Sequence, residues 1–212
     1  MPRFFVGTDQ ISDKNIVITG TDVNHIRNVL RMAPSEEVTV SDGQGMDYFC
    51  KIAELTKEEV RLDIIDSWHS FVELPAKIYL FQGLPKADKM ELIIQKAVEL
   101  GVYEIVPVAT KRAVVKLDAK KEEKKRLRWQ SIAESAAKQA GRALIPQVAP
   151  CMNFDKALRM CNGLDAALIP YEKAEGMQHA RDQVRALHGK HSIGIFIGPE
   201  GGFEESEIEA AR

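Results

Sequence analysis

The stretch KIYLFQGLPKADKMELIIQKAVELGVYEIVPV, residues 77 to 108, decides the fold class of this chain. It opens with an apolar strand-like run and closes with another, YEIVPV. Between them, apolar residues recur at helical spacing before a glycine that supplies the stop; these residues are Met90, Ile93, Ile94, Ala97 and Gly101. The order strand, helix, strand predicts a βαβ unit, and therefore a largely parallel sheet covered by helices.

The same alternation continues toward the C-terminus. A second helix is expected from about Glu122 to Gln139. The later segments are FDKALRMC at 154 to 161, the apolar DAALIP at 165 to 170, a helix around 177 to 187 and the strand SIGIFIG at 192 to 198. Open sheets of this kind bind ligands outside the carboxyl ends of their strands. IPYE at 169 to 172 and GPEGG at 198 to 202 both lie at such ends.

The glycine segment GPEGG lacks the spacing of the common phosphate-binding loops. It is not G-x-G-x-x-G, and it has no Lys-Ser/Thr pair to make a P-loop. Glutamates at 200, 204, 205 and 207 crowd the start of the next helix and would repel a phosphate there. We therefore expect a neutral or cationic ligand held through backbone groups. The alternative is a strand-to-helix turn in which the glycines only let the backbone bend.

The sequence before residue 73 has a different pattern. Short β-type runs alternate with turn signals such as SDGQG at 41 to 45. The runs are Phe4 to Val6, Ile16 to Ile18, Val38 to Val40, Tyr48 to Ile52 and Val60 to Ile64. We expect a small β-barrel over residues 1–72 and an α/β domain over residues 73–212.

A helical insert, DVNHIRNVLRM at 22 to 32, interrupts these strands. Helical spacing places three apolar residues on one face, namely Val23, Ile26 and Leu30. Arg27 and Arg31 are four residues apart and are expected on another face, either in contact with nucleic acid or solvated.

Composition excludes several classes of protein. With 212 residues, 45% of them hydrophobic and 28% charged, the chain can bury a substantial core. No apolar run approaches the roughly 20 residues that span a bilayer, and the apolar run in MPRFFVGTDQ is too short for a secretory signal. A cytoplasmic protein without a membrane role is therefore expected.

The residues that commonly bind metals give no sign of a metal site. Cys50, Cys151 and Cys161 have no paired spacing, so we interpret them as buried, reduced thiols. His188 and His191 lie in a loop without an accompanying ligand pattern. No metal and no disulfide are predicted.

The formal net charge of -2 hides an asymmetry along the chain. Residues 111 to 128 carry nine basic and three acidic side chains, a local balance of +6. Residues 198 to 212 carry five glutamates and one arginine, a balance of -4. The basic segment is suited to a phosphate backbone, although charge runs also occur on solvated helix faces.

Four motifs occur in order along the chain, namely HIRNVLRM at 25 to 32, KMELIIQKAVELGV at 89 to 102, RWQSIAESAAKQAGR at 128 to 142 with Pro146, and IGPEGGF at 197 to 203. Together they resemble the RsmE family. The RsmE family comprises SPOUT-class methyltransferases that use S-adenosylmethionine (SAM) to methylate N3 of a uridine in 16S ribosomal RNA of the small subunit. The resemblance covers nearly the whole chain.

The resemblance implies an RNA-binding PUA-like β-barrel over 1–72 and a trefoil-knotted SPOUT domain over 73–212, an exception to the rule that chains do not thread their own loops. It also implies a homodimer with SAM bound in the knot near the subunit interface. The family continues with a further strand and a Leu-Gly-x-Arg-Ile-Leu-Arg-x-Glu-Thr-Ala segment that completes the knot. This sequence stops at Arg212, so we expect its second domain to be C-terminally incomplete.

The resemblance also implies where the cofactor is held. Two loops are expected to form the walls of the SAM pocket. Their residues are Leu168, Ile169, Pro170, Tyr171, Glu172, Ile197, Gly198, Pro199, Glu200, Gly201 and Gly202. SAM carries a sulfonium cation, which an acid-rich loop tolerates better than a pyrophosphate.

Catalysis requires the methyl carbon and the uridine N3 in near-attack geometry, and N3 must lose a proton. Arg142 is the first candidate to stabilise the resulting anion or to position RNA, and Gln139 is a catalytic candidate with it, because Gln139 and Arg142 match the family's Gln-x-x-Arg element. The alternative is that Arg142 is a solvated arginine at a helix end. Glu200 is a weaker catalytic candidate, since it can instead organise the loop.

Basic residues from both domains are expected to contact the RNA. They are Arg3, His25, Arg27, Arg31, Lys111, Arg112, Lys120, Lys121, Lys124 and Arg128. Two other classes of function are compatible with the sequence. One is a non-catalytic RNA-binding or ribosome-assembly factor of the same fold, and the other is a small-molecule enzyme that binds a nucleotide at the glycine loop.

Overall fold

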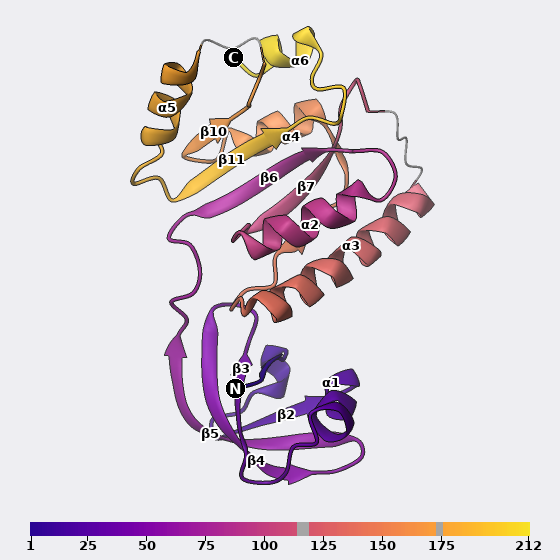
Figure 1. Ribbon diagram of the computed structural model, residues 1–212, viewed down its shortest axis with the longest axis vertical. Coiled ribbons are helices and arrows are strands. Elements are labelled where there is room, and N and C mark those ends of the chain that lie inside the picture. The colour runs from indigo at the N-terminus through magenta and orange to yellow at the C-terminus, as the bar shows by residue number, and fades with distance from the viewer. Residues whose placement is uncertain (114–118, 173–175) are drawn as a thin grey trace. The chain divides into compact units, whose positions relative to one another are not determined.

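The structure is a computed structural model that describes residues 1–113, 119–172 and 176–212 (Figure 1). Lys116 and Asp118 of the basic segment lie outside these residues. The chain forms two compact units. The small unit contains Met1–Glu73 and Ala137–Ile145, and the large unit contains Leu74–Ala136 and Pro146–Arg212. Residues 137 to 145, placed in the second domain by the sequence pattern, thus pack with the N-terminal unit.

The small unit is built on a curled five-stranded sheet. Its strands are β1 (Arg3–Phe5), β2 (Asn15–Thr19), β3 (Glu37–Ser41), β4 (Met46–Leu55) and β5 (Glu59–His69), in the spatial order β1-β3-β4-β5-β2. A short 3-10 helix, η1 (Thr8–Gln10), follows β1. Only the β1–β3 pair is parallel among the described pairings of this sheet. All five predicted β-type runs form strands.

Alternation of apolar residues explains which face of this sheet is buried. In each strand every second side chain points into one core. The innermost residues are Ile16, Ile18, Val38, Val40, Cys50, Ile52, Val60 and Leu62. The β4–β5 pair has two register shifts, after Phe49 and after Ile52. Such irregularities bend long strands, and they let this pair wrap around the core.

The helical insert differs in detail from its prediction. It comprises α1 (Thr21–Asn24) and a π-helical turn, η2 (His25–Val29). Val23 and Ile26 are buried as expected, but Leu30 is 40% exposed. The N–H of Leu30 donates to the carbonyl of His25, five residues back, which rotates Leu30 away from the core. Arg31 has a φ of +54° and so lies beyond the helix. The predicted shared helical face of Arg27 and Arg31 is therefore wrong.

The large unit is a parallel sheet with helices, as predicted. Its strands are β6 (Lys77–Gly83), β7 (Glu104–Ala109), β8 (Gln147–Val148), β9 (Met152–Asn153), β10 (Ala166–Leu168) and β11 (Ser192–Ile197). The spatial order is β10-β11-β6-β7-β8, and β9 also pairs with β7. Each of these pairings is parallel.

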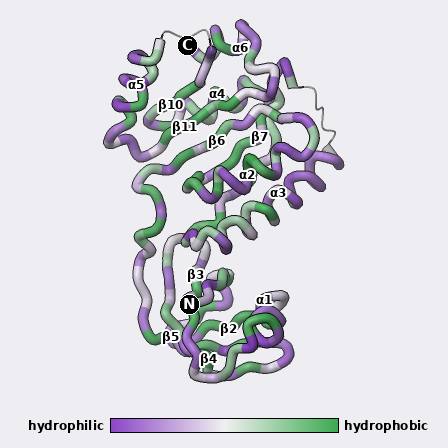
Figure 2. Tube along the Cα trace, viewed as in Figure 1, coloured by the Kyte–Doolittle hydropathy of each residue, from purple (hydrophilic) through white to green (hydrophobic). Residues whose placement is uncertain are grey.

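Five helices accompany this sheet in the described residues. They are α2 (Lys89–Glu99), α3 (Ala119–Ala140), α4 (Phe154–Cys161), α5 (Met177–Arg185) and α6 (Glu205–Ala210). α2 buries Met90, Ile94 and Val98, which lie on one face. The side chain of Asn153 caps α4 by accepting the N–H of Lys156 at 2.9 Å. Figure 2 shows hydrophobic residues concentrated along the central strands β6, β7 and β11.

Aromatic rings form the core beside β11. Phe81 of β6 stacks on Phe196 of β11 with ring centroids 4.4 Å apart and planes 7° apart. Phe154 of α4 contacts both Phe196 and Phe203, each at 5.7 Å between centroids. Phe196 precedes the glycine segment and Phe203 follows it. Both ends of that segment are therefore fixed in one apolar cluster.

Candidate cofactor pocket and the Arg142 cluster

The glycine loop, residues 198 to 202, leaves the sheet at the carboxyl end of β11. Gln82 of β6 is in register with Ile197, and its side chain is buried. Its Nε2 donates to the carbonyl of Gly83 at 2.9 Å. The same nitrogen lies 3.5 Å from the Ile197 carbonyl and 3.4 Å from the Gly198 carbonyl. A buried amide therefore fixes the first peptide groups of the loop.

Close packing explains the glycines around this loop. A Cβ added to Gly83 would lie 2.6 Å from Cδ of Pro199, and one added to Gly198 would lie 3.0 Å from Cα of Gly202. Gly202 has a φ of +68°, in the left-handed region that favours glycine. The loop thus needs glycine for its close approaches and its turn.

Glu200 ties the loop to the start of α2. Its carboxylate accepts Nζ of Lys89 at 2.8 Å and the backbone N–H of Lys86 at 3.2 Å. The hydrogen bond from Lys89 is the main cause that lowers the pKa of Glu200 from 4.5 to about 2, assisted by backbone N–H groups. At neutral pH Glu200 is therefore a carboxylate held in place.

Lys111 and Arg112 contact the acidic segment that follows the loop. Arg112 donates from Nε to Glu204 and from Nη1 to the Gly201 carbonyl, each at 2.9 Å. The backbone N–H of Lys111 donates to Glu207 at 2.9 Å. The basic and acidic segments of the sequence thus meet, and two of the predicted RNA contacts lie against the glycine loop and α6.

A cavity of about 300 Å³ lies between the two predicted walls. It is lined by Arg112, Pro170, Tyr171, Glu172, Gly198, Pro199, Glu200, Gly201, Gly202 and Phe203. Sequence reasoning missed two of these, Arg112 and Phe203. Phe203 could have been found as the aromatic residue that ends IGPEGGF, whereas no local signal links Arg112 to the cavity.

Three residues of the predicted walls lie outside this cavity lining. Leu168 and Ile169 line a separate apolar cavity of about 310 Å³, together with residues of α4 such as Leu158 and Cys161. Ile197 is the last residue of β11, and its carbonyl faces Gln82. The geometry therefore gathers most of the predicted pocket residues but not these three.

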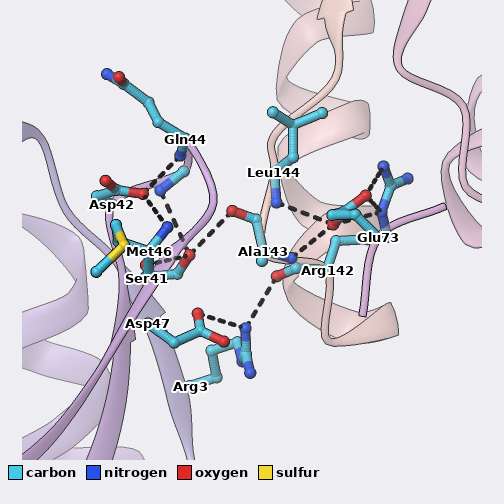
Figure 3. Close-up of polar contacts among 11 residues, drawn as sticks. Arg3, Ser41, Asp42, Gln44, Met46, Asp47, Glu73, Arg142, Ala143 and Leu144 are labelled. Atoms are coloured by element: carbon cyan, nitrogen blue, oxygen red, sulfur yellow. Dashed lines mark hydrogen bonds and ion pairs between the residues drawn. The ribbon is translucent and has the colours of Figure 1, made fainter. Parts of the chain in front are cut away.

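Arg142 lies in the small unit and is buried, with a side chain 6% exposed. Its Nε donates to both carboxylate oxygens of Glu73, at 3.0 and 2.9 Å, and its Nη2 also donates to Glu73 (Figure 3). The same carboxylate accepts the N–H groups of Ala143 at 2.8 Å and Leu144 at 3.1 Å. Arg142 is therefore not a solvated helix-end arginine. Gln139, three residues earlier on α3, is exposed.

Further contacts hold the segment after α3 in the small unit. The hydroxyl of Ser41 donates to the carbonyl of Ala143 at 3.0 Å. Arg3 donates from Nη1 to the carbonyl of Arg142 at 3.4 Å and to the buried Asp47 at 2.9 Å. Arg3, one of the predicted RNA contacts, thus has part of its guanidinium engaged within the protein.

The other predicted RNA contacts have different surroundings. His25 packs edge-on against Phe4, with ring centroids 6.1 Å apart. Arg27 is half-buried, and Arg31 is exposed. Arg128 forms an ion pair with Glu91 of α2 at 2.7 Å. The remaining residues, Lys120, Lys121 and Lys124, are exposed on the first turns of α3.

Two other expectations concern metals and thiols. Within residues 1–113, 119–172 and 176–212, no group of His, Cys, Asp and Glu side chains has an arrangement that could hold a metal ion. Cys50 and Cys161 are buried free thiols, whereas Cys151 is only half-buried, which corrects its prediction. Burial raises the pKa of Cys50 to about 12 and that of Cys151 to about 11. None of the helices over these residues is long and apolar enough to span a membrane.

Two family models match this arrangement. One, described as RNA methyltransferase domain, covers residues 72–212, and the other, described as RNA methyltransferase PUA domain, covers residues 18–65. The fold and these matches define the class as an RNA methyltransferase with a PUA domain.

Individual relatives are more specific. Ribosomal RNA small subunit methyltransferase E of Bacillus subtilis (strain 168) is 37% identical over 99% of this chain and 84% of its own length. A crystal structure of Ribosomal RNA small subunit methyltransferase E from Neisseria gonorrhoeae, bound to S-adenosyl methionine, is 31% identical with a TM-score of 0.83, covering 100% of this chain and 84% of its own. A methyltransferase from Legionella pneumophila, in complex with bound SAM, is 28% identical with a TM-score of 0.80, covering 99% and 84%.

The chain belongs to the ribosomal RNA small subunit methyltransferase E family. This confirms the resemblance drawn from the four sequence motifs, the two-part fold and the enzyme class. The roles of individual site residues are a separate matter, and they remain predictions.

Proposed function

We propose that this chain transfers the methyl group of SAM to N3 of a uridine in 16S ribosomal RNA. The observation that carries the proposal is the cavity at the carboxyl ends of β10 and β11, where Pro170, Tyr171 and Glu172 lie opposite the glycine loop. Its volume of about 300 Å³ falls within the usual range of small-molecule sites.

The residues around the cavity fit SAM. The glycine loop presents peptide groups that can pair with an adenine. Close packing at Gly83 and Gly198 restricts the backbone of the loop to one conformation. The carboxylate of Glu172 favours a cationic ligand such as a sulfonium and disfavours a pyrophosphate. When bound, SAM supplies an electrophilic methyl group. The contribution of the loop is to hold that group in a fixed position toward the nucleophile.

The reaction also requires that uridine N3 lose its proton. A cation near the uracil oxygens stabilises the anion that results. We assign this role, or the positioning of the RNA, to Arg142, because its guanidinium is oriented in advance by Glu73. Gln139 is proposed to contact the RNA beside it. We assign Glu200 to organising the loop, since a carboxylate with a pKa of about 2 is a weak base.

The RNA is proposed to bind the basic residues that remain at the surface. These are the lysines that begin α3, Lys120, Lys121 and Lys124, together with Arg27 and Arg31 of the small unit. His25, Arg3 and Arg128 are proposed as further contacts of the RNA, and each also contacts another residue of the protein. We further propose a cytoplasmic homodimer that acts on the small ribosomal subunit.

The test is methyl transfer from labelled SAM to small ribosomal subunits from cells that lack this modification, with the labelled nucleoside identified. We expect label in 3-methyluridine. Label in any other nucleoside contradicts the proposed position of methylation. RNA binding without SAM binding or transfer contradicts the proposal as a whole and supports the non-catalytic RNA-binding alternative.

A further inference from the structure

The cavity has an unusual distribution of charge. Its lining contains two carboxylates, Glu172 and Glu200, and Arg112 is the one cation among the described lining residues. Glu200 is engaged by Lys89 and by the N–H of Lys86. SAM has three charged groups, namely a sulfonium, an ammonium and an α-carboxylate. The α-carboxylate is the only one that an arginine attracts.

Arg112 is held in a defined position. Its Nε donates to Glu204 and its Nη1 to the Gly201 carbonyl, each at 2.9 Å. Its side chain also lies along Gly201, where an added Cβ would be 3.5 Å from Cβ of Arg112. The neighbouring Lys111 is anchored through its backbone N–H to the buried Glu207. The guanidinium is therefore oriented before any ligand arrives.

Arg112 keeps donors for a ligand. Its hydrogen bonds to Glu204 and Gly201 use Nε–H and one N–H of Nη1, and a guanidinium has further N–H donors at Nη1 and Nη2. The side chain is 42% exposed, so these donors are accessible. The fork of an arginine matches the two oxygens of a carboxylate, which a lysine cannot reproduce.

We propose that Arg112 binds the α-carboxylate of the cofactor and selects ligands that carry one. This inference rests on the proposed function, because it assumes that SAM occupies the cavity. It moves Arg112 from the RNA contact that the basic segment suggested to a contact with the cofactor.

Decarboxylated SAM is the probe that isolates this contact, because it lacks only the α-carboxylate. Calorimetric titration would compare SAM and decarboxylated SAM on the wild-type protein and on Arg112→Gln, without RNA. We expect the wild type to bind SAM about tenfold or more tightly than decarboxylated SAM, as one charge-assisted contact is typically worth that factor. Arg112→Gln should lose this preference by weakening SAM alone.

Arg185→Gln is the matched control. Arg185 is an exposed arginine that also pairs with a carboxylate, Asp182 at 3.5 Å, but it lies on α5 outside the lining of the cavity. It should keep the wild-type preference. Arg112→Lys, which retains the charge, provides a second variant if Arg112→Gln folds poorly, and it should show a reduced preference for SAM.

Three results would overturn the inference. Equal weakening of both ligands would make Arg112 only a support for the loop. An unchanged preference in Arg112→Gln would remove it from the cofactor site. A smaller salt dependence of RNA binding in Arg112→Gln, with SAM affinity unchanged, would return it to the RNA contact. If the wild type binds neither ligand, the proposed function itself fails, which is a distinct outcome.

Discussion

The carboxylate of Glu73 pairs with the guanidinium of Arg142 across 69 positions of sequence, and it also accepts the backbone N–H groups of Ala143 and Leu144. One side chain thus neutralises a buried cation and satisfies two peptide groups in the turn after α3. Losing it would remove the acceptor that these three groups share.

Replacing Glu73 should destabilise the protein strongly. Glu73→Ala removes the carboxylate that pairs with the Arg142 side chain, which is 6% exposed, and breaking a buried pair costs about 3 kcal/mol of unfolding free energy. Urea denaturation would measure this loss. Glu58→Ala, at an exposed position of the same unit, should change stability by less than about 0.5 kcal/mol. Equal stabilities of the two variants would contradict the structural role of the pair.

Replacing Arg142 should separate turnover from cofactor binding. Arg142→Ala is expected to lower the methyl-transfer rate by about 100-fold or more, the typical effect of removing a charge-stabilising donor. SAM affinity should stay nearly intact, because Arg142 is not among the residues that line the cavity. The methyl-transfer rate and the SAM affinity would both be measured at a temperature well below the unfolding transition. Arg159→Ala on α4 is the control. Unchanged turnover would rule out the assignment of Arg142.

A methyl group at Gly83 should displace the glycine loop. Its Cβ would lie 2.6 Å from Pro199 Cδ and 2.8 Å from Pro199 N, so the loop must shift. Overpacking of this kind costs about 1–3 kcal/mol, and we expect Gly83→Ala to weaken SAM binding by about tenfold or more. Gly163→Ala, whose added Cβ would meet Met160 O at an ordinary 3.6 Å, should bind SAM like the wild type. Matching affinities in both variants would show that the loop tolerates the shift.

The tether between Glu200 and Lys89 should weaken only in acid. Because the pKa of Glu200 is lowered from 4.5 to about 2 in the folded protein, the tether is fully present above about pH 4.5 and is lost as the pH falls toward 2. The carboxyl carbon of Glu200, followed by NMR, should titrate with a midpoint near 2. In Lys89→Met, which removes the largest cause of the shift, the midpoint should rise toward 4.5. A midpoint that does not move would mean that Lys89 does not hold this carboxylate.

The affinity for RNA should fall steeply with salt. Neutralising Lys120, Lys121 and Lys124 together as glutamines should reduce the slope of log K against log salt by about two to three, close to one per lost phosphate contact. Lys57, Lys156 and Lys190, replaced together, form the control, since they are exposed lysines outside the predicted RNA contact. Equal slopes for the two triple variants would remove the start of α3 from the RNA interface.

Local patterns were sufficient to predict most of the elements. Each local pattern describes one face of one element. The helical spacing around Met90 and Ile94 and the period-2 alternation of Val38 and Val40 are examples, and these residues are buried in the structure as the patterns predicted. Leu30 was misplaced because a π-turn changes the angular step between residues, and spacing alone assumes a regular helix.

Local patterns could not predict contacts between segments that are distant in the sequence. Arg112 belongs to a basic run in the sequence, but its partners Gly201 and Glu204 lie about ninety residues further on. Likewise, nothing near Arg142 in the sequence indicates that Glu73 neutralises it. The predicted domain boundary between residues 72 and 73 was placed where the local sequence pattern changes. Such a pattern carries no information about the unit with which residues 137 to 145 pack.

The inclusion of residues 137 to 145 in the small unit has a consequence for how the protein matures. Glu73 receives its partners only when that later segment has been synthesised, by which time β6, α2 and β7 of the large unit have already been made. The N-terminal unit therefore cannot finish folding as the first product of translation, nor can it be excised as one continuous fragment. The small unit can be completed only after residues 74 to 136 of the large unit have been synthesised.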